Sequence, residues 1–162
     1  MRATRLAIYP LLLFGLLFSG ALPSAAGGVD FSVLNGSWKL VPELGKAMPG
    51  REGEYERNTL AFSASVDVFR LQGERGITVY AFSAVNGLLI AYQTASFAAG
   101  GNGAFTITTK YTPGADSRLE YTLEDKDTII RRHWSGAYVY KRADDFRPSP
   151  DALKGLKPEL RF

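Results

Sequence analysis

One short segment, residues 128–134, holds most of the side chains that could do chemistry. It contains the only histidine, His133, which directly follows Arg131 and Arg132. One histidine and no cysteine leave no multi-histidine or thiolate metal site, and we expect no cofactor. The two arginines disfavour a protonated imidazole and so oppose a general-base role for the histidine. We therefore expect a protein that is not an enzyme and has no catalytic residue.

The two arginines point to opposite faces if the segment is a strand, because side chains alternate along it. An inward arginine could bind a carboxylate or a phosphate through its planar fork of donors. One alternative is an internal ion pair of Arg131 with Glu120 or Asp67, and the other is that the arginine lies near the rim of the barrel and stays hydrated. The residues of this segment do not decide which of the two arginines faces inward.

Tyrosines are the second candidate group. Tyr121, Tyr138 and Tyr140 lie in the last strands that the sequence predicts. A tyrosine offers an apolar ring with a polar tip, which suits the lining of a small-molecule pocket, although it is also an ordinary strand residue. We take these three and Arg131 as the candidate ligand-binding residues.

The elements that position these residues read as short strands with turns between them. Asn86-Gly87 is a dipeptide that favours a hairpin turn. Runs that recur about every ten residues favour an antiparallel sheet, and closure into a barrel removes its exposed edges. We expect an all-β, eight- or nine-stranded antiparallel up-and-down barrel, with strands in 36–41, 60–68, 76–84, 88–97, 105–111, 119–123, 128–134 and 137–142.

Two segments do not fit the strand pattern. Residues 42–57 mix glycine, proline and charges of both signs, which indicates a solvated loop that covers part of the barrel. A helix is expected only near the C-terminus, over residues 151–156, where Ser149 could cap it and Pro150 could begin it.

The first 26 residues read as a secretory signal peptide. Arg2 and Arg5 precede an apolar run from Leu6 to Phe18, and small residues follow up to Ala26. We expect cleavage after Ala26, with Ala21 as the alternative. The apolar run falls short of the roughly 20 residues that span a bilayer, so we expect a periplasmic or secreted chain that does not span a membrane.

Removal of that segment leaves residues 27–142 as one barrel domain and 143–162 as a tail. The formal charge of +3 includes Arg2 and Arg5, and without them 17 basic residues stand against 16 acidic ones. A nearly neutral chain gives no reason to expect nucleic acid as a partner.

The run Leu34-Asn35-Gly36-Ser37-Trp38 resembles the opening of the lipocalin-like (calycin) barrels. In that family a Gly-x-Trp places the indole across the closed end of the barrel, and a basic residue of the last strand packs on it. Arg142 stands where that partner is expected. The resemblance therefore implies structural roles for Gly36, Trp38 and Arg142, and places Tyr138 and Tyr140 on the inward face.

The closing hairpin extends the resemblance through residues 119–142. If Ile129 corresponds to the inward leucine of the family hairpin, Arg131 and His133 also face inward. The family shares its barrel and not its ligand, so no binding residue follows from the resemblance.

Two functions are consistent with these features. The first is an exported barrel that holds a small apolar or amphipathic molecule without a reaction. The second is a barrel that binds a protein, as an inhibitor or accessory subunit, through its loops and residues 143–162, which carry Phe146, Leu153, Leu156, Leu160 and Phe162.

Overall fold

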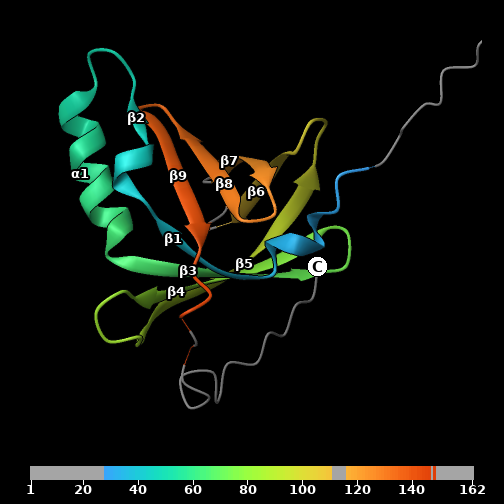
Figure 1. Ribbon diagram of the computed structural model, residues 1–162. Helices are drawn as coiled ribbons and strands as arrows, with labels where there is room; N and C mark the ends of the chain where they lie inside the picture. The colour runs from blue at the N-terminus through green and yellow to red at the C-terminus, as the bar shows by residue number, and fades with distance from the viewer. Residues whose placement is uncertain (1–27, 111–115, 147, 149–162) are drawn as a thin grey trace, which may run out of the picture.

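The fold is a closed antiparallel barrel, seen in a computed structural model that describes residues 28–110, 116–146 and 148. The first strand, β1 (Gly36–Leu40), pairs with both β3 and β9, and this closes an eight-strand sheet (Figure 1). The expected barrel is thus confirmed. Its other strands are β3 (Ser65–Gln72), β4 (Gly76–Ser83), β5 (Leu89–Ala99), β6 (Ala104–Lys110), β7 (Asp116–Asp125), β8 (Thr128–His133) and β9 (Gly136–Arg142).

A ninth strand, β2 (Lys46–Ala47), lengthens the edge that β9 shares with β1. It pairs with Gly136 and Ala137, while β1 pairs with the other half of β9. Two close approaches depend on glycine, because a Cβ on Gly136 or Gly45 would collide with the Tyr55 side chain.

The strand register fixes which side chains face inward, because residues opposite each other in an antiparallel pair share a face. Trp38 lies opposite Asp67 on one side and opposite Arg142 on the other. Continued around the sheet, this face carries the apolar core, which comprises Leu34, Trp38, Leu40, Phe69, Ile77, Ala95, Phe97, Phe105, Ile107, Tyr121, Leu123, Ile129, Tyr138 and Tyr140.

One end of the barrel is closed by a short 3-10 segment, η1 (Phe31–Leu34), on the right in Figure 1. Trp38 is fully buried beneath it and donates from Nε1 to the Leu34 carbonyl at 2.8 Å. The Arg142 guanidinium lies 4.4 Å from the centre of the Trp38 ring, which is the expected contact.

Arg142 of β9 also connects η1 and the β7–β8 turn at the closed end. Its guanidinium donates to the carbonyls of Val33 and Asn35 near η1 and of Lys126 in the β7–β8 turn. Gly36 has a φ of +133°, and a Cβ there would lie 2.7 Å from an Arg142 nitrogen. A glycine therefore provides the space in which this guanidinium sits.

The expected loop over 42–57 and the first half of the expected strand over 60–68 are wrong. A short 3-10 turn, η2 (Pro42–Leu44), precedes β2, and a helix, α1 (Glu52–Ser63), precedes β3. Glu52 and Glu54 lie in the first helical turn, where their negative charges interact favourably with the helix dipole. The alternation of Leu60, Phe62 and Ala64 therefore does not mark a strand.

The alternation of Val66 and Val68 would place these two valines on the buried face of a strand, but β3 has the opposite orientation. The register turns Asp67, Phe69 and Leu71 inward instead. Val66 is nevertheless 3% exposed, because this outer surface of the barrel is covered too.

The chain after β9 covers part of that outer surface. The Ala143 amide donates to the Ser37 carbonyl, and the Phe146 ring packs 5.6 Å from that of Phe82. The hairpin turn at Asn86-Gly87 is present, with Gly87 at φ +66°. The predicted signal peptide and the predicted helix over 151–156 lie outside the described residues.

Candidate functional site

A cavity of about 570 Å³ occupies the half of the barrel that faces away from η1. Side chains of five strands form its wall, and all of them except Tyr92, which lies opposite Tyr80 on the outer face, point inward. Six of the ten lining residues carry a polar group, so this cavity is more polar than a typical ligand pocket. The lining comprises Asp67 of β3, Val79 and Ala81 of β4, Ala91, Tyr92 and Gln93 of β5, Ser117, Leu119 and Tyr121 of β7, and Arg131 of β8.

Arg131 supplies the positive charge of this cavity. It faces inward, as expected from the family alignment, while Arg132 is exposed. Its guanidinium lies 4.2 Å from the centre of the Phe62 ring, so α1 holds it in place from the mouth of the barrel. Its Nε is buried and has no hydrogen-bond partner among the described residues.

The two ion pairs considered as alternatives for Arg131 do not form. Glu120 pairs with Arg118 on the outer face at 3.6 Å. Asp67 shares the cavity with Arg131, but no nitrogen–oxygen distance of 4.0 Å or less joins them. Both charged groups therefore line the cavity without forming an ion pair with each other.

Asp67 is the acidic group of the cavity, and its environment is unusual. Burial raises the pKa of its carboxyl to about 6, although the Ser65 hydroxyl and the charge of Arg131 both lower it. The Ser65 hydroxyl donates to the carboxylate at 3.2 Å. A carboxyl whose pKa is displaced in a cleft marks a functional-site candidate.

The three candidate tyrosines all face inward but play different parts. Tyr121 lines the cavity and stacks on Phe105 at 5.0 Å between ring centres, which makes an aromatic floor. Burial raises its pKa to about 12, so the hydroxyl stays neutral. Tyr140 lies close enough to interact with Arg131, and burial raises the pKa of Tyr140 as well.

Tyr138 belongs to the packing of α1 and not to the cavity wall. It is fully buried between Tyr55, which stacks on it at 4.8 Å, and Phe62. Its hydroxyl lies 2.7 Å from the Ser135 hydroxyl. The structure thus keeps Tyr121, Tyr140 and Arg131 together and gives Tyr138 a supporting position.

His133 belongs to a structural network at the mouth of the barrel. Its Nδ1 lies 2.7 Å from the Ser135 hydroxyl, which also accepts from the Asn58 amide of α1. Burial and the nearby Arg131 lower the pKa of His133. Ser135 is fully buried, so this pair connects α1 to the barrel and presents no exposed nucleophile.

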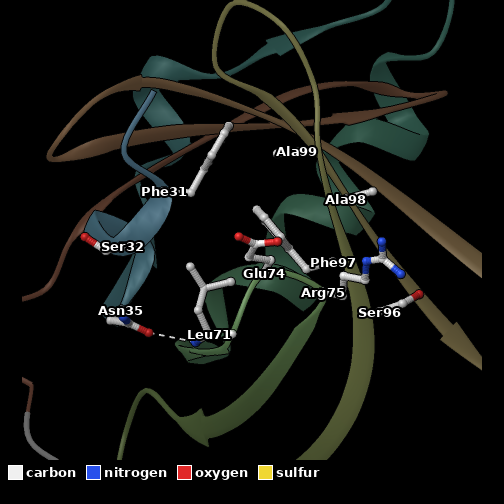
Figure 2. A pocket seen from close by; sticks show the side chains of 11 residues that line it. Phe31, Ser32, Asn35, Leu71, Glu74, Arg75, Ser96, Phe97, Ala98 and Ala99 are labelled. Atoms are coloured by element: carbon white, nitrogen blue, oxygen red, sulfur yellow. Dashed lines mark hydrogen bonds between the residues drawn. The ribbon is translucent and has the colours of Figure 1, made fainter. Parts of the chain in front are cut away.

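A second hollow, of about 830 Å³, lies beside η1 at the closed end of the barrel. Figure 2 shows Phe31 of η1 beside it and Asn35, whose side-chain oxygen accepts from the Leu71 amide at 2.7 Å. Its charged lining residues, Glu74 and Arg75, are exposed turn residues. The interior cavity, with buried and perturbed groups, is the stronger candidate site.

Exposed apolar side chains gather on the loops at the open end of the barrel. They come from η2, the β2–α1 turn, α1, the β4–β5 turn, the start of β5 and the β8–β9 turn, and Val85 is the most exposed at 94%. We call this set the apolar rim; it consists of Leu44, Met48, Leu60, Val85, Leu88, Ile90 and Trp134.

Within the part of the chain that the structure describes, no three acidic or histidine side chains come together in a way that could hold a metal ion. No helix within those residues has the length and apolar character to cross a membrane.

Comparison of the chain with protein-family models, with curated proteins and with solved structures gives no match. The site therefore rests on its own geometry. Of the residues that sequence reasoning named, Arg131 and Tyr121 line this cavity and Tyr140 does not, while Asp67 was considered only as a possible ion-pair partner. The available signal was the alternation of inward and outward side chains along the strand. The apolar valines on either side of Asp67 suggested that Asp67 faces outward, whereas the register turns it inward.

Proposed function

We propose that this protein binds a small amphipathic molecule in the interior cavity and carries out no reaction on it. The observation that carries the proposal is the cavity of about 570 Å³ in which a half-buried arginine faces the stacked rings of Tyr121 and Phe105. The apolar part of the ligand would lie against Leu119, Val79 and Tyr121, and its polar head would face Arg131.

The geometry of Arg131 supports an anionic head group. Its buried Nε lacks a partner among the described residues, and an unmet donor in a buried site favours a ligand that accepts from it. The contact with Phe62 fixes the plane of the guanidinium, so less freedom is lost when a carboxylate binds.

We further propose that the barrel is lipocalin-like and that the mature chain is exported. The contact of Arg142 with Trp38 after a Gly-x-Trp supports the first point. Arg2, Arg5 and the following apolar run support the second. The mass of protein purified from an exported fraction would test cleavage after Ala26 directly.

The binding proposal predicts a selective effect of Arg131→Met. A hydrogen bond to a charged group contributes about 1.5–3 kcal/mol, so this variant should bind decanoate roughly 10- to 100-fold more weakly. Methyl decanoate lacks the charge, and its affinity should change little. Titration followed by tryptophan fluorescence measures both ligands with both proteins.

Arg132→Met is the matched control, because Arg132 neighbours Arg131 but is exposed on the outer face. It should bind decanoate as the wild type does. Equal losses for decanoate and its ester would remove Arg131 from the site. No binding of either ligand by the wild type would contradict the proposed function.

A second candidate function is the binding of a protein by the open end of the barrel. The apolar rim favours it, because clustered exposed apolar side chains often mark interaction surfaces. The two functions differ in whether the cavity binds a ligand. Failure of the wild type to bind decanoate, its ester or other amphiphiles would favour the protein-binding function.

A further inference from the structure

The cavity combines one half-buried cation and one half-buried carboxyl that are not paired with each other. Arg131 comes from β8 and Asp67 from β3, and both line the same space. An anionic ligand on Arg131 would therefore also lie close to Asp67. At the short distances inside a barrel, two negative charges near one cation repel each other strongly.

The surroundings of Asp67 contain one positive charge to offset its own. Ser65 lies on the same strand, Arg131 faces it from β8, and the hydroxyls of Tyr121 and Tyr140 face it from β7 and β9. Its partners across the sheet, Trp38 of β1 and Ala81 of β4, do not ionise. His133, farther along β8, is influenced by Arg131 and not by Asp67.

Two groups favour the ionised form of Asp67: the Ser65 hydroxyl, which has the larger effect, and the charge of Arg131, which the ligand would occupy. Burial already raises the pKa of Asp67 to about 6, and a ligand anion on Arg131 would raise it further. A group whose pKa rises on binding takes up a proton during binding, and the affinity then falls as the pH rises.

We propose that the cavity takes up a singly charged anionic amphiphile together with one proton from solvent, and that Asp67 is the group that accepts the proton. The inference rests on the proposed function and adds to it the charge of the ligand and the coupled proton. Arg131 holds the head group, and neutralised Asp67 no longer repels it. Binding therefore strengthens as the pH falls toward mildly acidic values.

The probe for this proposal is decane-1-sulfonate, because a sulfonate keeps its charge over the whole range studied. Calorimetric titration between about pH 6 and pH 8 should show the affinity of the wild type falling by up to about tenfold per pH unit. Titration at neutral pH in two buffers of different ionisation enthalpy should show an uptake that approaches one proton.

Asp67→Asn removes the titrating group and keeps the size of the side chain. This variant should bind the sulfonate at least as tightly as the wild type, with an affinity that does not change with pH and no proton uptake. Asp145→Asn, at an exposed position past β9, is the matched control and should keep the wild-type pH dependence.

The outcomes separate this inference from the proposed function. Tight binding of the sulfonate by the wild type, without proton uptake or pH dependence, overturns the inference alone. Unchanged proton uptake in Asp67→Asn does the same, because another group must then take the proton. No binding by the wild type or by Asp67→Asn at any pH overturns the proposed function and the inference with it.

Discussion

Trp38 and Arg142 show how two residues can close one end of a barrel. The indole is fully buried, and the guanidinium above it also donates to carbonyls of η1 and of the β7–β8 turn. This contact was expected from the resemblance of the Gly-x-Trp run and the last strand to the lipocalin-like barrels. The inward position of Asp67 could not be predicted, because Val66 is buried on the opposite face.

Trp38→Ala should lower the free energy of unfolding by about 3–5 kcal/mol, since truncation of a buried tryptophan removes packing and leaves a cavity. Arg142→Met should cost less, about 1–3 kcal/mol, because it removes the cation–π contact and hydrogen bonds but keeps the core. Urea denaturation followed by circular dichroism measures both.

Arg70→Met, at an exposed position of β3, is the control and should unfold as the wild type does. A Trp38→Ala variant with the wild-type urea midpoint would contradict the structural role of the indole. A larger loss for Arg142→Met than for Trp38→Ala would show that the hydrogen bonds of the guanidinium matter more than the core.

At the scale of elements, the strands from β4 to β9 could be predicted and α1 could not. The strands alternate apolar and polar residues and are separated by glycine-containing turns. The inner face of α1 carries Tyr55, Asn58 and Phe62, which have the spacing of one helix face. Because Asn58 is polar, these residues do not form a clear apolar pattern in the sequence. A short helix with little aliphatic character gives a weak periodic signal.

The helix and the expected strand make different predictions for Leu60 and Phe62. Two residues apart, they would share a face in a strand, but in α1 Leu60 is 75% exposed while Phe62 packs on Tyr138 and Arg131. Phe62→Ala should therefore destabilise the protein by about 1–3 kcal/mol, because its ring is partly buried.

Leu60→Ala should change the free energy of unfolding by less than about 0.5 kcal/mol, as expected for an exposed side chain. The urea midpoints of the two variants give the comparison. Similar losses at both positions would mean that Leu60 is also packed against the barrel, which contradicts the position of α1.

At the scale of the whole molecule, the two ends of the barrel differ in construction. The closed end has a continuous core, from Leu34 and Trp38 to Phe97 and Phe105. The open end has the cavity, α1 and the apolar rim. Along the first half of β5, side chains on both faces are exposed, including Ile90, Ala91 and Tyr92. A ligand that enters the cavity must pass this less densely packed end.

This difference predicts an uneven pattern of hydrogen exchange. Amides in the first half of β5 should exchange faster than those of β8 and β9, because local opening is easiest where few side chains are buried. Hydrogen–deuterium exchange resolved by peptide measures this directly. Peptides from β1 and β9, next to the Trp38–Arg142 contact, serve as the protected reference.

Addition of decanoate should slow exchange in β5 and β7, whose side chains line the cavity, and leave the closed end unchanged. Equal protection of both ends in the free protein would contradict the construction described above. Protection that appears only near η1, around Phe31 and Leu71, would indicate that the ligand binds in the second hollow, at the closed end.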